Sequence, residues 1–121
     1  MKHILLVDDE PELLQMLSSH FADRYTIDTA TSSAAAVARF IQRRPDVVFL
    51  DVNMPGTSGV HVLKLFQEAD SRVPDIMVTA NSEIRIADEC LKSGAFGWVP
   101  KPPRLVYMDH MAAMAMDQRR K

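Results

Sequence analysis

Short apolar runs alternate along the chain with longer segments in which apolar residues recur at helical spacing. The runs with strand character are residues 3–8, 25–30, 46–51, 75–80 and 96–100. Runs of this length indicate strands, and their alternation with helical segments is typical of βα units around a parallel sheet. We therefore predict an α/β fold with five strands and about five helices.

Signals at the helix ends support this division of the chain. Pro11 suits the first turn of a helix that starts near Glu10, because the N–H that proline lacks has no partner there. A fourth helix over 82–93 can end at Gly94, which tolerates a left-handed conformation, and a last helix includes 105–116. The candidate caps of the second and third helices are Ser32 or Ser33 and Thr57 or Ser58.

The strands differ in their expected burial, which indicates which strands are central in the sheet and which lie at its edges. Segment 25–30 alternates polar with apolar residues, and segment 96–100 contains Gly97 and Pro100, so both suit sheet edges. A doubly wound, flavodoxin-like (βα)5 sheet of order 2-1-3-4-5 satisfies these placements and puts a ligand crevice beyond the carboxyl ends of strands one and three. Three segments are continuously apolar, as expected for central strands covered on both faces: 4–7, 47–50 and 76–78.

Composition narrows the class of protein. The chain has 121 residues, 47% of them hydrophobic, and a net charge of -2, which shows no bias toward nucleic acid or a membrane. The single cysteine, Cys90, excludes an intramolecular disulfide and suits a reducing compartment. We expect one cytoplasmic domain over residues 1–121, with no output domain in this chain, no direct nucleic-acid binding and no membrane contact.

Polar residues gather at the ends of the predicted strands. Asp8 and Asp9 follow strand one, Asp51 ends strand three, Thr79 lies at the end of strand four, and strand five leads into Lys101. In a parallel sheet these ends share one edge, so three carboxylates converge there. Like charges so close are costly unless cations intervene. Lys101 and a bound metal are the two candidates.

The donor types favour phosphate chemistry. Hard oxygen ligands without a His or Cys cluster suit Mg²⁺, which commonly binds one or two carboxylates together with phosphate oxygens. We predict that Asp51 is a nucleophile able to form an aspartyl phosphate and that Asp8 and Asp9 hold the metal. Lys101 would supply a second cation and the Thr79 hydroxyl a directed hydrogen bond.

Four stretches with matching order and spacing carry a family resemblance: LLVDDEP, VVFLDVNMPGTSG, IMVTAN and WVPKPP. Together they resemble the receiver domain of a bacterial two-component response regulator, over essentially the whole chain. The resemblance implies that Asp51 accepts a phosphoryl group from a histidine kinase or a phosphotransfer protein in a phosphorelay. It also implies that Thr79 and Lys101 contact that group.

The resemblance assigns further roles. Asp8, Asp9 and Asp51 would bind Mg²⁺ together with the backbone carbonyl of Asn53. Trp98 would occupy the position of a switch aromatic residue, where the family usually has Tyr or Phe. The peptide bond between Lys101 and Pro102 would be cis.

The last helix has few polar positions, since only Asp109 and His110 in 105–116 are clearly polar. We predict that its second apolar stripe, with the fourth helix and the fifth strand, forms a surface for an output domain, a partner or a homodimer. The alternative is a helix that is buried more than usual. The core stripe is Leu105, Met108, Ala112 and Ala115, and the second stripe is Tyr107, Met111 and Met114.

Two other functions share parts of this pattern. A metal-dependent phosphohydrolase of the aspartyl-phosphate type usually has an acid two residues after the nucleophile, where this chain has Asn53. A flavodoxin-like FMN module needs a loop rich in Ser, Thr and Gly after strand one, where this chain has DDEPE. We therefore favour a regulatory phosphoacceptor that catalyses only its own phosphotransfer and dephosphorylation.

Overall fold

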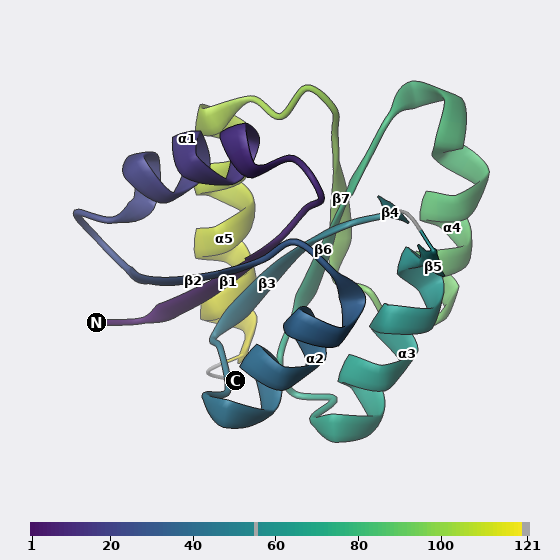
Figure 1. Cartoon of the computed structure of the whole chain (residues 1–121), viewed down its shortest axis with the longest axis horizontal. Coiled ribbons are helices and arrows are strands. Elements are labelled where there is room, and N and C mark those ends of the chain that lie inside the picture. The colour runs from purple at the N-terminus through teal and green to yellow at the C-terminus, as the bar shows by residue number, and fades with distance from the viewer. Residues whose placement is uncertain (55, 120–121) are drawn as a thin grey trace.

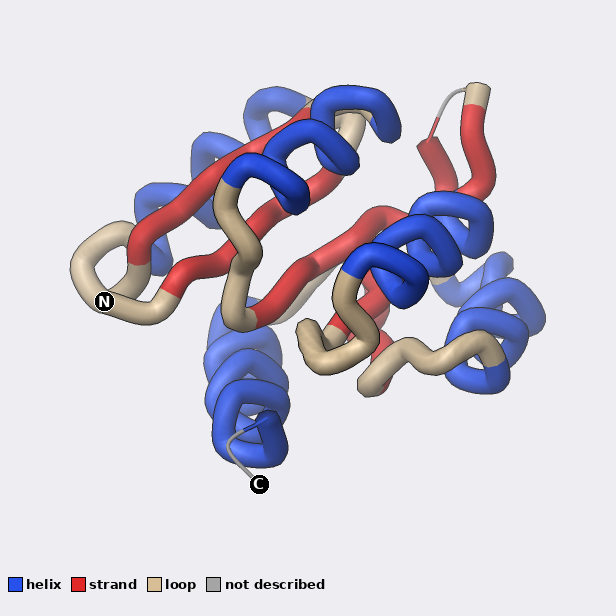
Figure 2. The backbone as a smooth tube through the Cα atoms, turned by 90° about the horizontal axis from the view of Figure 1, so that it is seen from below, coloured by secondary structure: helices blue, strands red, loops and turns tan. Residues whose placement is uncertain are grey.

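A five-stranded parallel sheet forms the centre of the computed structural model, which describes residues 1–54 and 56–119 (Figure 1). The strand order is β2-β1-β3-β6-β7, which confirms the predicted order 2-1-3-4-5. A separate antiparallel hairpin, β4–β5, stands apart from this sheet (Figure 2). The strands are β1 (His3–Val7), β2 (Thr26–Ala30), β3 (Val47–Asp51), β4 (Asn53–Met54), β5 (Thr57–Ser58), β6 (Asp75–Thr79) and β7 (Gly97–Pro100).

Helices cover both faces of the sheet, with α1 and α5 on one face and α2, α3 and α4 on the other (Figure 1). Among the residues described, every helix is too short or too polar to cross a bilayer. The helices are α1 (Pro11–Phe21), α2 (Ser33–Gln42), α3 (Gly59–Ala69), α4 (Ile84–Lys92) and α5 (Leu105–Arg119), with a 3-10 turn η1 (Asn81–Glu83) before α4.

The helix starts follow local hydrogen bonding. The Ser32 hydroxyl accepts from the Ala35 N–H and caps α2, and the Ser58 hydroxyl accepts from the Val60 N–H and caps α3. Helix α4 begins later than the predicted residue 82. The Glu83 N–H bonds to the Ala80 carbonyl at 2.9 Å, an i to i+3 contact that makes the first turn a 3-10 turn.

Two hydrophobic clusters explain the continuously apolar strands. In β1, β3 and β6, successive side chains point alternately into the cluster under α1 and α5 and the cluster under α2, α3 and α4. Aromatic pairs lie in both clusters: Phe21 stacks on Phe49 and Phe40 on Phe66. The central strands are therefore buried on both faces, as their sequences indicate.

Helix α5 departs from the prediction at one residue. Met108, Ala112 and Ala115 are buried as predicted, but Met111 is only 9% exposed and belongs to the core, so its place in a second, exposed stripe was wrong. The reason is Gly97 on β7, because a Cβ there would lie 2.7 Å from the Met111 methyl carbon. The exposed stripe therefore reduces to Tyr107 and Met114, which are 43% and 56% exposed.

The start of α3 depends on a close backbone approach at Gly59. Its N–H donates to the Val52 carbonyl at 2.8 Å, and a Cβ at this position would lie 2.5 Å from the Val52 oxygen and 2.9 Å from the Asp51 oxygen. The absence of a side chain at Gly59 thus lets α3 pack directly behind the end of β3.

We expect Gly59→Ala to lower the free energy of unfolding by about 3 kcal/mol, because the backbone of β3 must move to admit the methyl group. The matched control is Gly56→Ala, which meets no atom within 4 Å and is strained only by its φ of +80°, a cost of about 1 kcal/mol. Urea unfolding of both variants measures the difference. A loss at Gly59 no larger than that at Gly56 would contradict the prediction.

Candidate functional site

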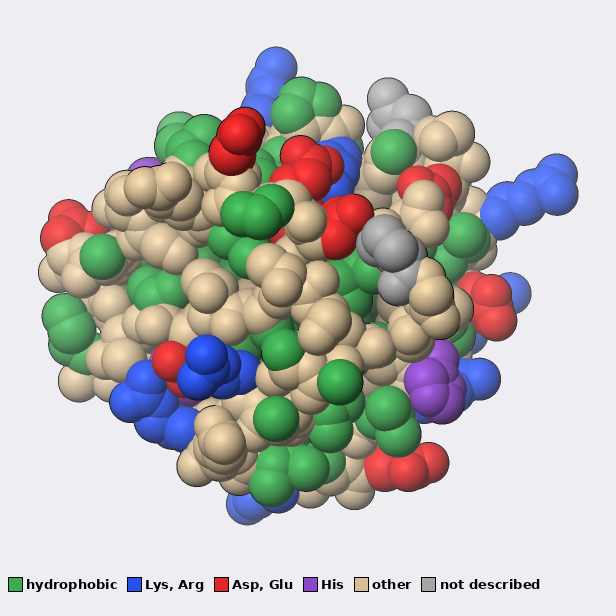
Figure 3. Space-filling model, in the orientation of Figure 1, with side chains coloured by type: hydrophobic (Ala, Val, Ile, Leu, Met, Phe, Trp, Pro, Cys, Tyr) green, Lys and Arg blue, Asp and Glu red, His purple; other side chains and the backbone are tan. Residues whose placement is uncertain are grey.

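The predicted polar residues lie together at the carboxyl edge of the sheet. The parallel register of β1 and β3 pairs Val7 with Leu50. The residues that follow these two, Asp8 and Asp51, are therefore neighbours. Both are 3% exposed. Figure 3 shows acidic side chains gathered beside a basic one near the upper edge of the molecule. The arrangement follows from the parallel register, which brings separate strand ends to one edge.

Lys101 is the shared cation of this edge. Its Nζ lies 3.1 Å from Asp8 Oδ2, 3.3 Å from Asp51 Oδ2 and 3.4 Å from Glu10 Oε1. Burial alone would lower the pKa of Lys101, but the charges of Asp51 and Asp8 outweigh it and hold the pKa above its usual value. The lysine is therefore always charged. Sequence reasoning treated Glu10 only as a helix-start residue, although its place beside Asp8 and Asp9 was a usable signal.

One lysine does not balance the buried acids. Burial raises the pKa of Asp51 to about 6, against the opposing hydrogen bond from the Asn53 N–H at 3.2 Å. Burial likewise raises the pKa of Asp8, against a hydrogen bond from the Glu10 N–H at 2.9 Å. Raised carboxyl pKa values beside a lysine mean that the site still favours additional positive charge.

The donor set fits a hard divalent cation. Asp8, Asp9 and Glu10 each offer a carboxylate oxygen, and these oxygens lie within 4.8 Å of one another. An all-oxygen set of this kind suits Mg²⁺. Asn53 is exposed at the start of β4, two residues beyond Asp51. The contribution of Asp51 and of the Asn53 carbonyl to a metal site stays a prediction.

Thr79 lies at the end of β6, which neighbours β3, and Trp98 lies on β7, the edge strand beyond β6. The Thr79 hydroxyl is buried and is within hydrogen-bond reach of the Ala80 and Glu83 carbonyls, at 3.2 Å and 3.4 Å, so it connects the end of β6 to η1. Trp98 is partly buried on β7 and packs against the cluster under α2, α3 and α4. The Lys101–Pro102 bond is cis, which confirms the expectation from the family.

The β4–β5 hairpin was not predicted as strands, because each strand has only two residues. It begins two residues after Asp51, the last residue of β3, and Gly56 at its turn has a φ of +80°. The Ser33 hydroxyl donates to the Thr57 hydroxyl oxygen at 3.0 Å and links the hairpin to the start of α2. The hairpin that carries Asn53 is thus joined to β3 on one side and to the start of α2 on the other.

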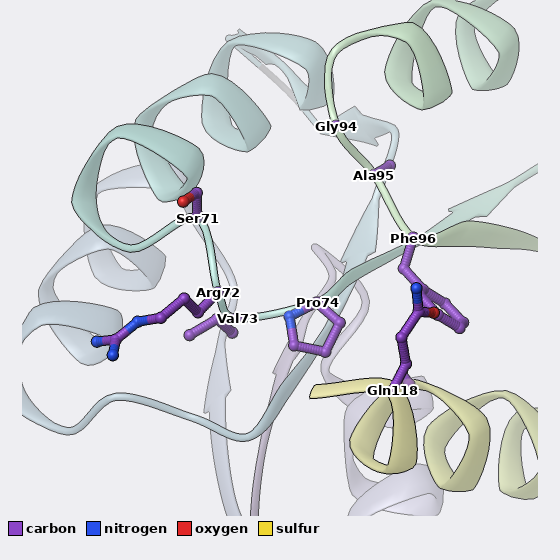
Figure 4. Close-up of a pocket in the computed structure, with 9 residues that line it drawn as sticks. Ser71, Arg72, Val73, Pro74, Gly94, Ala95, Phe96 and Gln118 are labelled. Atoms are coloured by element: carbon purple, nitrogen blue, oxygen red, sulfur yellow. The ribbon is translucent and has the colours of Figure 1, made fainter. Parts of the chain in front are cut away.

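A hollow of about 470 Å³ lies at the opposite, amino end of the sheet (Figure 4). It is formed by the loop after α3, the turn between α4 and β7, and the end of α5. Its walls include Arg72, Pro74, Phe96 and Gln118. None of the predicted site residues lines it, so the acidic edge and this hollow are separate features.

Comparison with known proteins agrees with this geometry. Residues 4–112 match the family described as the response regulator receiver domain. The regulatory protein AtoC of Escherichia coli is 39% identical over 100 residues, which are 82% of this chain and 22% of that protein. The nitrogen assimilation regulatory protein NtrX of Azorhizobium caulinodans is 31% identical over 123 residues, covering 97% of this chain and 27% of that protein. The chain therefore spans about a quarter of the length of these two relatives.

Solved structures show the same arrangement over nearly the whole chain. A receiver domain protein from Clostridium thermocellum superposes with a TM-score of 0.94 at 26% identity, covering 99% of this chain and 98% of that one. The chemotaxis protein CheY4 of Vibrio cholerae superposes with a TM-score of 0.88 at 29% identity, covering 95% and 98%. The fold is thus shared with free-standing receiver structures.

We expect Asp51→Asn to raise the free energy of unfolding at pH 8 without divalent metal by about 1–3 kcal/mol, because the ionised Asp51 is costly to bury. The folded state retains the Asp51 proton up to about pH 6, whereas the unfolded chain loses it near pH 3.8. The free energy of unfolding of the wild type therefore falls as pH rises between these values.

Urea unfolding at pH 8 and at about pH 4 measures this effect, and the difference from wild type should vanish at the lower pH. Glu12→Gln, at an exposed acid in the first turn of α1, is the matched control. An Asp51→Asn protein that is less stable than wild type at pH 8 would contradict the expectation.

Proposed function

The chain belongs to the response regulator receiver domains, which are phosphorylation-controlled signalling modules, and we propose that Asp51 is its phosphoacceptor. The observation that carries this proposal is the position of Asp51 at the end of β3, beside the buried Asp8 and in contact with the Lys101 ammonium group that pairs with both acids. A carboxylate so placed can act as a nucleophile toward phosphorus. Receiver domains work with histidine kinases, and the specific donor here would be a kinase or a phosphotransfer protein.

The transfer step uses residues of this edge. An oxygen of the Asp51 carboxylate forms a bond to phosphorus while the bond from phosphorus to the leaving atom of the donor breaks. Lys101, 3.3 Å from Asp51, stays within reach of the oxygens of the transferred group. Water later attacks the same phosphorus, the bond between phosphorus and the Asp51 oxygen breaks, and inorganic phosphate leaves. The carboxylate is restored, so the domain ends each cycle unchanged and acts as a regulator.

Asp8 and Asp9 would hold Mg²⁺, completed by Asp51 and the Asn53 carbonyl. The bound ion would supply neutralisation of the charge on the phosphoryl oxygens. Asp8 would serve both cations, because its Oδ2 also pairs with Lys101. Glu10 lies on the same side and would add negative charge near the metal.

Thr79 provides a route from the acceptor to the rest of the fold. Its hydroxyl is directed at the Ala80 and Glu83 carbonyls in the unmodified protein. A phosphoryl group on Asp51 offers stronger acceptor oxygens, so the hydroxyl turns toward it and leaves η1. The segment before α4 then shifts its population of conformations, and Trp98 on the neighbouring β7 moves with it.

We propose that the protein works in the cytoplasm, which the free, buried thiol of Cys90 suits. We propose no direct contact with nucleic acid or with a membrane for residues 1–121, since the net charge is only -2.

We expect incubation with Mg²⁺ and acetyl phosphate to add one phosphoryl group to the wild-type protein, and none to Asp51→Asn, because Asp51 is the proposed acceptor and Asp8, the other buried carboxylate beside Lys101, would be occupied as a metal ligand. Asp8→Asn should slow the reaction by roughly tenfold or more and raise the Mg²⁺ concentration needed, through loss of a metal ligand. Intact-mass spectrometry follows the adduct, and Glu12→Gln is the matched control.

An adduct that persists in Asp51→Asn would contradict the assignment of the acceptor. Steady release of phosphate from a small phosphate ester over many turnovers would instead favour the phosphohydrolase. An FMN module would be revealed by a yellow purified protein, whereas the proposed receiver is colourless.

The output surface is proposed at the β7 edge of the sheet. Edge strand β7 lies between the two helical layers, and apolar side chains are exposed on the adjacent helices: Leu91 on α4 at 39% and Tyr107 and Met114 on α5 at 43% and 56%. Exposed apolar residues grouped on neighbouring elements favour a protein partner. We propose that phosphorylation strengthens a homodimer contact or the binding of an output domain at this surface.

We expect Met114→Glu to weaken phosphorylation-dependent dimerisation by roughly tenfold or more, because a charge would be buried at the contact. Sedimentation equilibrium with and without acetyl phosphate measures the association. Met16→Glu on α1, at a methionine that is 45% exposed, is the matched control. A phosphorylated wild-type protein that stays monomeric would contradict the homodimer and leave the output domain as the partner to test.

A further inference from the structure

Asp75 is a buried acid that the phosphoacceptor site does not use. It is the first residue of β6, at the end of the strand opposite Thr79, and it is 0% exposed. Its Oδ2 accepts a hydrogen bond of 2.7 Å from Gln67 Nε2 on α3. Its Oδ1 has no hydrogen-bond partner among residues 1–54 and 56–119. One of the two oxygens of this carboxyl group is therefore buried without a hydrogen bond.

No cation in the described part of the chain forms an ion pair with Asp75, in contrast to the acids of the acceptor site. A carboxylate buried without a counter-charge is far more costly than a neutral carboxylic acid. Burial raises the pKa of Asp75 to about 7, and the Gln67 hydrogen bond is the smaller opposing influence. The neutral form is thus the one that the fold accommodates.

The neighbours of Asp75 supply no other charge. Its side chain shares the face of β6 with Met77, toward α2, α3 and α4. It pairs in register with Val48 on β3, and α3 contributes Gln67. Helix α4 contributes Cys90 to this core, and burial raises the pKa of that thiol to about 11, so it is neutral at physiological pH.

Gln67 connects this acid to the turn between α4 and β7. A Cβ on Gly94 would lie 2.9 Å from Gln67 Oε1, so the glutamine side chain sits directly against that turn. Gly94 has a φ of +107°, and the Phe96 N–H donates to the Asp75 carbonyl at 2.8 Å. One side-chain pair therefore joins the last part of α3, the start of β6 and the α4–β7 turn.

We propose that Asp75 is a proton-controlled latch: its neutral form holds α3, β6 and the α4–β7 turn together through Gln67, and loss of its proton opens this junction. The ionised carboxylate needs water or a cation, and it obtains either by parting α3 from the turn. The junction includes β6, which carries Thr79, and borders α4 and β7, which carry Leu91 and Trp98. The latch is independent of the proposed phosphoryl transfer, because it lies at the other end of β6.

The direction of the effect follows from proton binding. The closed junction keeps the Asp75 proton up to about pH 7, whereas an opened, solvated carboxyl group loses it near pH 3.8. Opening therefore becomes easier as pH rises between these values. With these two pKa values, the equilibrium constant for opening of the junction increases about tenfold from pH 6 to pH 8.

Carboxyl-carbon NMR of protein labelled in aspartate tests the latch without any substitution. The Asp75 signal should titrate with a midpoint near 7, while Asp70, whose pKa Arg72 holds below the usual value, should titrate well below it. A midpoint for Asp75 below about 5 would show that the buried carboxylate is tolerated as an ion and would overturn the proposal.

Amide hydrogen exchange tests the opening itself. At Gly94, Ala95 and Phe96, exchange corrected for the intrinsic rate should rise about tenfold between pH 6 and pH 8 in the wild type. Asp75→Asn, which cannot ionise, should abolish this rise, and Asp70→Asn on the same side of the fold should retain it. Equal pH dependence in the wild type and Asp75→Asn would overturn the latch. If Asp75→Asn does not fold, a wild-type exchange rate that is flat across this pH range has the same meaning.

Discussion

The contact of one lysine with two buried carboxylates is the interaction on which the acceptor site depends. Asp8 and Asp51 come from separate strands and would repel each other if Lys101 did not lie 3.1 Å and 3.3 Å from their oxygens. The parallel register of β1 and β3 sets that proximity, and the segment after β7 returns Lys101 to the same edge. The ends of β1, β3 and β7 thus bring two negative charges and one positive charge to one place.

Lys101 alone does not balance the negative charge at this edge. The pKa of Asp51 remains raised to about 6 even beside Lys101. The fold therefore gives up some stability to keep this carboxylate out of water, as functional sites often do. A divalent cation would relieve part of that cost, which supports the proposed metal site at this edge.

Strand β6 connects the two ends of the domain, and polar side chains occupy both of its termini. Thr79 joins its carboxyl end to η1 at the acceptor site, while Asp75 joins its amino end to α3 and the α4–β7 turn. Between them the strand is buried and apolar. Both termini contact segments that flank α4, so this helix is the element that the two polar groups can influence from opposite sides.

The amino-acid sequence by itself determined the strand order, the capped starts of α2 and α3, and the identity of the acidic edge, because apolar periodicity and the sharing of one edge by parallel strand ends are local or topological rules. Tertiary structure alone decided the rest. Met111 is buried because Gly97, on a distant strand, leaves room for its methyl group. Glu10 joins Lys101, and Gln67 meets Asp75, only when separate elements pack together. Such contacts depend on distances between elements, and no pattern along one segment contains them.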